Sequence, residues 1–490
     1  MPETCLWTAA EIRSATLGKG GADLIARGVS IDSRTAVFGD VFIALRGAKT
    51  DGHGYVAGAF KKGATMAIVD TPPKGVDPDD KRLIYVADTK KALYDLAAFA
   101  RKRTKATIIA IAGTAGKTSL KECLVPALEP MGKAHANAKS LNNHIGVPLS
   151  LCRMPAHALN GVFEIGSSHP GDLEPLVKLV NPHHGIITNV SASHFEGFET
   201  MEALLAEKAV LAAHVQKDGC VFIDADCPSY EDLTNLLLRR KELKIKAISN
   251  ALEQAYCHAK NIKHHDDCSC FAAKVGSQNM LVKIGVGGDH WVKNALFVLA
   301  VCQTIKADLG RAGLALAHMK SVIGRGRKHK IPVWDGHCTL IDESYNANPL
   351  TMRLAIKHLG KAKLRFTEAR RVAVLGAMHD LGDLSYEAHR DLVKTIKDNK
   401  IDKVFAIGED MIKACEKLPD GVLAGNYQTI EALYEDLRNK VVAGDVVLVK
   451  GSHDVNLSSL VSLIVNKPFG RYAHGQTVDM NQGLARESER

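Results

Sequence analysis

The residues with the clearest potential for chemistry lie in one short stretch, Gly113 to Ser119 (GTAGKTS). The apolar run from Ile108 to Ala112 precedes it, and an amphipathic segment follows. A strand that turns through glycines into a helix lets consecutive backbone N–H groups point at one anion, and the helix adds the positive end of its dipole. Lys117 would then reach the terminal phosphates of a nucleotide, and the Thr118 hydroxyl would contact the accompanying magnesium ion. The stretch predicts a phosphate-binding loop made of Gly113, Thr114, Ala115, Gly116, Lys117, Thr118 and Ser119.

This loop is a short variant, because the usual pattern has a glycine five residues before Gly116 and Ile111 occupies that place. The alternative interpretation is that the glycines only form a tight strand-to-helix turn. The strand expected before the loop and the helix expected after it favour phosphate binding.

Glu164 is the first of several polar residues at the ends of other predicted strands. It directly follows the apolar Phe163, and ligands bind at the carboxyl ends of the strands in open parallel sheets. A carboxylate in this place can join Thr118 on a magnesium ion, which prefers hard oxygen ligands. Taken alone, such a glutamate is more often an ordinary residue at the end of a strand.

Two further pairs of residues are weaker candidates. His194 is expected to end a strand, and Lys208 follows fourteen residues later on a predicted helix. His290 and Asn294 are four residues apart, which places them on one helical face, where the asparagine could hydrogen-bond a base edge. By themselves, such residues are more often structural or solvated.

Two other segments have simpler explanations. Residues 257–270 contain cysteine, histidine and aspartate side chains that can bind metals. Their spacing matches no familiar zinc arrangement, and the segment is typical of a hairpin loop. Residues 340–352 form a predicted strand followed by acidic and amide groups, and Asn348 before Pro349 is typical of a helix start.

The length and composition are those of a globular protein with about three domains. Of the 490 residues, 46% are hydrophobic and 24% are charged, and 63 basic against 54 acidic side chains give a net charge of +9. No arginine-rich or aromatic-interleaved basic stripe is present, so we expect phosphorylated small substrates rather than nucleic acid. Eleven cysteines without framework spacing, no export signal and no bilayer-length apolar run predict a cytoplasmic protein without membrane insertion.

Strand-like and helical stretches alternate along the chain, which predicts an α/β fold with three domains. We expect a small mixed α/β domain at residues 1–103 and a central parallel sheet that binds ATP through a P-loop at residues 104–328. A doubly wound, Rossmann-like domain is expected at residues 329–490.

The order of these segments resembles that of the Mur ligases, ATP-dependent enzymes of bacterial cell-wall synthesis, over nearly the whole chain. Residues 30–70 look like their uridine-nucleotide domain, residues 113–122 look like their ATP loop, and SLNNHIGVPLS (140–150) is typical of the MurF type. The resemblance implies a monomeric ligase that adds D-alanyl-D-alanine to UDP-N-acetylmuramoyl-tripeptide through an acyl phosphate, as a step in making peptidoglycan precursors.

The resemblance also implies roles for individual residues. Lys117, Glu164, His194 and Lys208 would be catalytic, and two magnesium ions would be held by Thr118, Glu164, His194 and Lys208. Lys208 would be carbamylated, because carbamylation replaces an ammonium group with the oxygen ligand that magnesium needs. Beyond the loop, ATP would contact His290, Asn294, Arg327, Asp342 and Glu343. The other substrates would contact Asp32, Ser33, Arg34, Asn142, Asn143, Tyr345, Asn346 and Asn348.

Four positions depart from the family pattern. His144 stands where an acidic residue is usual, Glu343 where aspartate is usual, Asp380 where glutamate is usual and His453 where arginine is common. The glutamate that commonly follows the lysine at position 208 is also absent. We expect a local difference in substrate contact at His144 and a nucleotide contact through a longer side chain at Glu343, and Asp380 is a conservative replacement.

Two alternatives remain on the sequence alone. A MurE-type or other amide ligase is disfavoured because no DNPR run is present. A P-loop kinase or a nucleotide-binding regulator would leave Lys208, the DSR motif at 32–34 and the SYNANP run at 344–349 unexplained.

Overall fold

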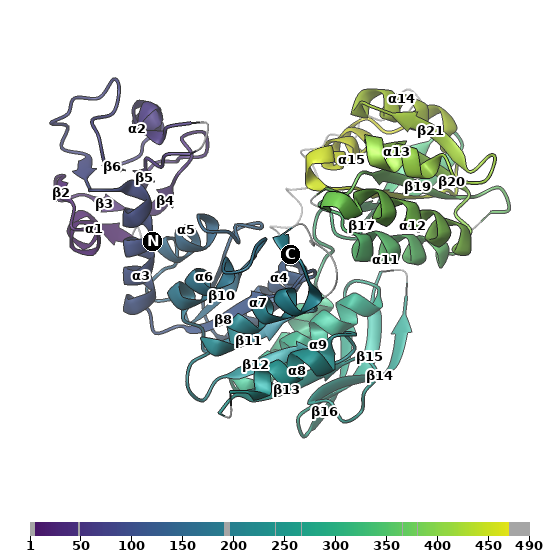
Figure 1. The fold of residues 1–490 in the computed structure, drawn as a ribbon, viewed down its shortest axis with the longest axis horizontal. Helices are drawn as coiled ribbons and strands as arrows, with labels where there is room; N and C mark the ends of the chain where they lie inside the picture. Colours follow the sequence, from purple (N-terminus) through teal and green to yellow (C-terminus); the bar gives the residue numbers. More distant parts are fainter. Residues whose placement is uncertain are drawn as a thin grey trace, which may run out of the picture. The chain divides into compact units, whose positions relative to one another are not determined.

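The computed structural model shows two units, Met1–Lys320 and Ser321–Arg490 (Figure 1). In each unit parallel strands alternate with helices, which confirms the predicted α/β fold. The second unit begins at Ser321, whereas we predicted the third domain from residue 329. The structure describes residues 5–47, 50–190, 197–240, 242–265, 267–364, 366–379 and 381–469.

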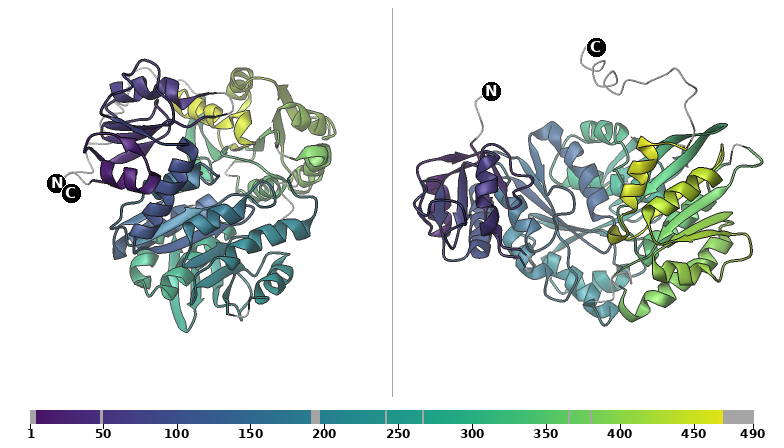
Figure 2. Two further views of the ribbon diagram at one scale, coloured as in Figure 1. Left: turned by 60° about the vertical axis from the view of Figure 1, so that its left-hand side comes forward. Right: turned by 90° about the horizontal axis from the view of Figure 1, so that it is seen from above.

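The first unit opens with a five-stranded sheet of order β2-β7-β6-β5-β4, seen at one end of this unit in Figure 2. Strands β4 to β7 are parallel, and β2 adds an antiparallel edge. The apolar runs near residues 41–47 and 66–70 form β5 and β6, whose residues are all buried. The elements are β1 (Trp7–Thr8), α1 (Ala9–Thr16), β2 (Lys19–Gly20), β3 (Ile25–Ala26), β4 (Gly28–Ser30), β5 (Asp40–Ile43), α2 (Val56–Lys61), β6 (Met66–Val69), β7 (Leu83–Tyr85) and α3 (Thr89–Arg103).

A nine-stranded sheet of order β16-β15-β14-β13-β12-β11-β8-β10-β9 forms the rest of this unit. Strand β8 lies between β10 and β11 and is parallel to both. Interior strands of a parallel sheet are covered on both faces, which explains why the sequence of β8 is a continuous apolar run. The elements are β8 (Thr107–Ala112), α4 (Lys117–Leu128), β9 (Ala134–Ala136), α5 (Gly146–Cys152), β10 (Asn160–Glu164), α6 (Leu173–Val180), β11 (His184–Ile187), α7 (Met201–Ala213), β12 (Cys220–Asp224), α8 (Tyr230–Leu238), β13 (Lys244–Ser249), β14 (Cys257–His264), β15 (Ser269–Val275), β16 (Gln278–Ile284), α9 (Asp289–Thr304) and α10 (Leu309–Ala317).

Strands β1 and β3 pair as a separate two-stranded antiparallel sheet, and residues of the five-stranded and nine-stranded sheets share one hydrophobic core. Helix α3 packs against α5, and the buried Trp7 indole donates a hydrogen bond of 2.8 Å to the Cys152 carbonyl oxygen. The guanidinium of Arg103 lies 3.8 Å from the Trp7 ring centroid. These contacts fix the amino-terminal sheet against the central one.

The segment predicted as a hairpin loop at 257–270 is partly strand. Residues 257–264 form β14, which pairs antiparallel with β15, and residues 269 and 270 already belong to β15. Alternating buried and exposed residues in β15 reflect its place in the antiparallel extension of the sheet.

The second unit is built on a six-stranded sheet of order β17-β18-β22-β19-β20-β21. All neighbouring strands are parallel except β17 and β18, which form a hairpin. The elements are β17 (Arg327–Val333), β18 (Gly336–Glu343), α11 (Pro349–Gly360), β19 (Arg371–Gly376), α12 (Ser385–Asp398), β20 (Lys403–Ile407), α13 (Glu409–Cys415), β21 (Leu423–Tyr427), α14 (Ile430–Lys440), β22 (Val446–Lys450) and α15 (Leu457–Asn466).

Three histidines support the fold only in their neutral form. The ring nitrogens of His183, His184 and His389 accept hydrogen bonds from the backbone N–H groups of Ile108, Cys220 and Met378 at 2.8, 3.2 and 2.8 Å. Burial lowers the pKa of each imidazole, that of His184 to about 4. Protonation would remove an acceptor and place a charge on a ring that is partly or, in His389, fully buried.

We therefore expect the protein to lose stability as the pH falls from about 6.5 to about 4, because the unfolded chain binds protons in this range and the folded chain does not. His184 alone would account for up to about 3 kcal/mol of this loss, at 1.36 kcal/mol per pKa unit. His184→Asn keeps an acceptor that cannot be protonated, so thermal unfolding curves of the variant should depend less steeply on pH. An unchanged pH dependence would contradict this role.

Candidate functional site

The predicted phosphate loop lies between β8 and α4, at the carboxyl end of an interior strand. Gly113 and Gly116 have φ angles of 134° and 82°, which glycine adopts without strain. The first N–H groups of α4 have no acceptors within the helix and are available to an anion. The Lys117 ammonium folds over the loop and donates to the carbonyl oxygens of Gly113 at 2.7 Å and Thr114 at 3.3 Å. The strand, glycine turn and helix agree with the sequence prediction.

The loop is anchored by the end of the neighbouring strand β11. The Thr188 hydroxyl donates to the Ala115 carbonyl oxygen at 2.7 Å, and the Asn189 side chain accepts from the Ala115 N–H at 3.0 Å. The Asn189 carbonyl oxygen also accepts from the Thr114 N–H at 2.9 Å. The strand ends at Ile187 and not near His194, as we had predicted, and the side chains of residues 188 and 189 bind the loop.

A larger side chain at position 113 should disrupt this loop. A Cβ there would lie 2.2 Å from the Thr188 hydroxyl oxygen, in a backbone conformation that other residues rarely adopt. We expect Gly113→Ala to weaken nucleotide binding and to lower stability by about 1–3 kcal/mol. Gly171→Ala is a matched control, because Gly171 also has a positive φ but no atom within 4 Å of the added Cβ. Equal nucleotide affinity in the two variants would contradict the prediction.

The side chains of Thr118 and Glu164 are in contact, as predicted, although the two residues lie on different elements. The Thr118 hydroxyl donates to the Glu164 carboxylate at 2.8 Å and lies 3.1 Å from the Ser140 hydroxyl. The other Glu164 oxygen accepts from the Asn142 side chain at 2.7 Å, and Glu164 is only 1% exposed. A hydroxyl and a carboxylate side by side are hard oxygen donors, so they fit magnesium.

Asn137 was missed by the sequence analysis and fixes the backbone of Glu164. Its side-chain oxygen accepts from the Glu164 N–H at 2.9 Å, and its side-chain nitrogen donates to the Glu164 carbonyl oxygen at 2.8 Å. Asn137 follows β9, which is the parallel neighbour of β10. The pattern that identified Glu164 is a polar residue at the carboxyl end of a parallel strand. The same pattern could have identified Asn137.

Lys208 lies on α7 and is 4% exposed. Its ammonium donates to the Ser167 hydroxyl at 2.5 Å and lies 5.5 Å from the Phe198 ring centroid. Burial lowers the pKa of Lys208 to about 7, and the nearby positive charge of Lys117 adds to this effect. Lys208 has no ion-pair partner among the described residues, which is uncommon for a buried lysine. Its lowered pKa favours the neutral amine near neutral pH.

Glu207 holds the loop that faces Lys208. Its two carboxylate oxygens accept from the backbone N–H groups of Gly171 and Leu173, each at 2.8 Å, and Leu173 begins α6. Glu207 is 5% exposed. This loop carries Ser167, so Glu207 indirectly fixes the partner of Lys208. His194, the remaining predicted metal ligand, lies outside the described residues.

The residues predicted to contact the base lie in the first two turns of α9. His290 is exposed and Asn294 is buried, so only part of the predicted shared face is accessible. Lys293 lies between them in the sequence, and its ammonium binds the carboxylates of Asp224, the last residue of β12, and Asp226, which follows this strand. This ion-pair group joins the start of α9 to the carboxyl edge of the central sheet.

The predicted uridine-nucleotide motif lies in the turn after β4. Asp32 and Arg34 form an ion pair of 2.7 Å, and the hydrogen bond from Arg34 lowers the pKa of Asp32 to about 2. Arg34 is exposed, and Ser33 between them is half-buried. Asn143 has a structural role, because its side-chain oxygen accepts from the Gly146 N–H at 2.9 Å where α5 begins.

In the second unit, the predicted residues gather where β18 and β22 end. The buried Asp342 carboxylate accepts from the Gly324 N–H at 2.8 Å and from the Ser344 hydroxyl at 2.6 Å. Glu343 lies 3.7 Å from the ammonium of Lys450, which donates to the Asn346 carbonyl oxygen at 2.8 Å.

Three other predicted residues lie on the same hairpin or in the segment that follows it. The exposed Arg327 is opposite Asp342 in the strand register of the β17–β18 hairpin. The Tyr345 ring lies 5.8 Å from that of His453, between centroids. Asn348 caps α11 by accepting from the Thr351 N–H at 2.9 Å, as the sequence predicted. Asp380 is outside the described residues.

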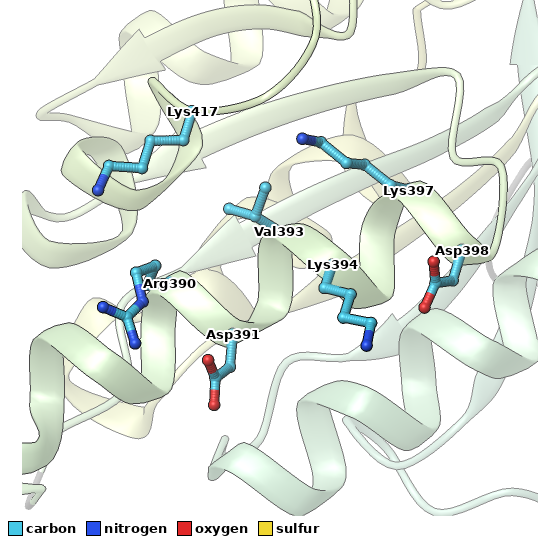
Figure 3. A pocket seen from close by; sticks show the side chains of 7 residues that line it. All are labelled: Arg390, Asp391, Val393, Lys394, Lys397, Asp398 and Lys417. Atoms are coloured by element: carbon cyan, nitrogen blue, oxygen red, sulfur yellow. The ribbon is translucent and has the colours of Figure 1, made fainter.

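The hollow in Figure 3 lies in the second unit and contains none of these predicted residues. It has a volume of about 440 Å³ and is lined by Arg390, Asp391, Val393, Lys394, Lys397, Asp398 and Lys417.

In the described part of the chain, no three histidine, cysteine, aspartate or glutamate side chains form a group that could hold a metal ion. No described helix has both the length and the apolar character that crossing a membrane requires.

The fold and the loop define a P-loop nucleotide-binding protein, and three family models match it. They are described as Mur ligase family, catalytic domain (residues 26–101), Mur ligase middle domain (residues 111–302) and Mur ligase, glutamate ligase domain (residues 326–453). The chain belongs to the Mur ligase family.

Individual relatives agree with these matches. The UDP-N-acetylmuramoyl-tripeptide–D-alanyl-D-alanine ligase of Treponema pallidum is 30% identical over 89% of this chain and 93% of its own length. The ligase of the same name from Escherichia coli is 29% identical over 90% and 94%. A crystal structure of MurF from Acinetobacter baumannii has a TM-score of 0.81 at 26% identity and covers 95% of this chain and 100% of that one.

Proposed function

We propose that this chain is a MurF-type ligase, which uses ATP to join D-alanyl-D-alanine to UDP-N-acetylmuramoyl-tripeptide in peptidoglycan precursor synthesis. The observation that carries the proposal is the near full-length similarity to ligases with this printed name, together with the Thr118–Glu164 pair beside the phosphate loop. We further propose that it acts as a monomer in the cytoplasm.

The reaction must activate a carboxylate, which is a poor electrophile. The terminal carboxylate of the tripeptide attacks the γ-phosphorus of ATP, and ADP leaves, which produces an acyl phosphate. The neutral amine of D-alanyl-D-alanine then attacks the acyl carbon, phosphate leaves with the former bonding electrons, and the nitrogen loses a proton to solvent as the amide forms. Because no protein nucleophile takes part, the protein contributes mainly positioning and electrostatic stabilisation.

Lys117 and the N–H groups at the start of α4 would hold the phosphates during the transfer. Magnesium, when bound, would neutralise the phosphate charge. Thr118 and Glu164 would supply oxygen ligands to it, and His194 and Lys208 would belong to the second of two ions. The nucleotide base would lie against α9 near His290 and Asn294. Arg327, Asp342 and Glu343 remain proposed ATP contacts.

We propose that Lys208 is carbamylated. An amine must be neutral to attack carbon dioxide, and the burial of Lys208 favours the neutral form. A carbamate would give this position an oxygen ligand, and the Ser167 hydroxyl that now accepts from the ammonium could instead donate to it. The burial and the Ser167 contact, rather than the pKa alone, support the modification.

Phosphate release from ATP tests the acceptor directly. We expect release only when UDP-N-acetylmuramoyl-tripeptide and D-alanyl-D-alanine are both present, together with a pentapeptide product seen by mass spectrometry. Release without the dipeptide would overturn the proposed acceptor, and steady phosphate transfer to another small molecule would favour a kinase.

A further inference from the structure

Lys121 is a buried cation beside the proposed metal ligands to which the reaction as described gives no role. It lies on α4 three residues after Thr118, so the two side chains occupy neighbouring places on the helix. Lys121 is only 1% exposed. A buried ammonium group is costly unless it is paired and hydrogen-bonded, so its partners indicate what it does.

Two of these partners are backbone carbonyl oxygens in one loop. The Lys121 ammonium donates to the Asn137 carbonyl oxygen at 2.7 Å and to that of Lys139. Lys139 has a φ of 51°, a left-handed conformation that is uncommon for a residue with a side chain. The ammonium therefore ties this loop to α4 at its conformationally unfavourable residue.

The same loop supplies the groups that orient the proposed magnesium ligands. Asn137 holds the Glu164 backbone, Ser140 contacts the Thr118 hydroxyl, and Asn142 donates to the Glu164 carboxylate. One loop thus contacts both ligands, and Lys121 anchors it to the helix that carries Thr118.

Lys121 also compensates the charge of the site. Its ammonium lies 3.9 Å from the Glu164 carboxylate oxygen that accepts from Thr118. The Glu122 carboxylate lies 3.4 Å from the Lys121 ammonium and is a second anionic neighbour. Its side chain is 44% exposed, so solvent screens the charge of Glu122. Glu164 is therefore the buried carboxylate that lies nearest to the Lys121 ammonium, and each group offsets the charge of the other.

We infer that Lys121 is a positioning residue for the magnesium–nucleotide site: it fixes the 137–142 loop, and through this loop the orientation of Thr118 and Glu164. The inference rests on the proposed magnesium site. Groups that orient metal ligands affect metal affinity by about 10- to 100-fold when they are removed.

The test measures binding, so it does not depend on the ligation reaction. Calorimetric titration with ADP, in the presence and absence of magnesium, gives the increase in affinity that the metal contributes. In Lys121→Met we expect this increase to fall by about 10- to 100-fold, while metal-free ADP affinity changes less than about threefold, because the loop backbone and Lys117 remain. Lys246→Met is a matched control, since Lys246 is a half-buried lysine that donates to Thr304 at 2.7 Å.

Two results would overturn the inference: an unchanged magnesium-dependent increase in Lys121→Met, or an equal loss of ADP affinity with and without the metal. If Lys121→Met does not fold, Lys121→Gln, which keeps a hydrogen-bond donor but no charge, is compared in the same way. A parent protein with no magnesium-dependent increase would overturn the proposed metal site and this inference together. A parent that shows the increase but does not ligate would overturn only the proposed acceptor.

Discussion

Lys208→Ala is expected to lower kcat for ligation by about 100- to 1,000-fold, the usual result of removing one preorganised electrostatic group from an active site. Lys208 is buried and would carry an oxygen ligand as its carbamate. Alanine leaves a space that a small anion can enter, so bicarbonate or chloride should restore part of the activity. Initial rates at increasing anion concentrations measure this recovery.

Lys208→Arg is the control for this experiment. Arginine keeps the positive charge, cannot form the carbamate and fills the space, so we expect low activity that anions do not restore. Incorporation of ¹³C-labelled bicarbonate into the parent protein, followed by NMR, detects the modification itself. Full activity of Lys208→Arg, or no recovery of Lys208→Ala with either anion, would contradict a carbamylated lysine.

Glu164→Gln is expected to cause a loss of similar size, about 100- to 1,000-fold in kcat. Glutamine has nearly the shape of glutamate and can still accept from Thr118 or Asn142, but it has no charge to offer a metal ion. It also leaves the buried Lys121 ammonium without its buried counter-charge, so stability should fall as well. Magnesium activation curves and thermal unfolding measure the two effects.

Glu122→Gln is the matched control, because Glu122 also lies near Lys121 but its side chain is 44% exposed. This variant should retain parental activity and magnesium dependence, since exposed ion pairs contribute about 0–1 kcal/mol. If Glu164→Gln kept the parental magnesium dependence, the assignment of Glu164 as a metal ligand would be wrong.

The sequence predicted the parts of the site that depend on local order along the chain. The apolar strand, the glycine turn and the helix from Lys117 are consecutive, so their pattern is visible without knowledge of the fold. Glu164 could be predicted because polar residues at the carboxyl ends of parallel strands lie on one edge of the sheet. The same argument placed Thr118 and Glu164 together, and in the structure the Thr118 hydroxyl donates a hydrogen bond to the Glu164 carboxylate.

The contacts that the sequence analysis missed join segments that are distant in the chain. Thr188 and Asn189 bind the phosphate loop across 73 and 74 residues, and Lys121 binds the Asn137 carbonyl oxygen across 16. Each of these residues has an ordinary alternative as a strand, loop or surface residue. Their role follows only from the pairing of β8 with β11 and from the packing of α4, which no local pattern encodes.

The most direct test of the account follows one oxygen atom. When the terminal carboxylate of UDP-N-acetylmuramoyl-tripeptide is labelled with ¹⁸O, activation as an acyl phosphate transfers one labelled oxygen to the phosphate that leaves. We predict that ligation to D-alanyl-D-alanine releases phosphate containing one ¹⁸O atom for each pentapeptide formed, as measured by mass spectrometry. Unlabelled phosphate would contradict carboxylate activation by ATP and, with it, the proposed ligase mechanism.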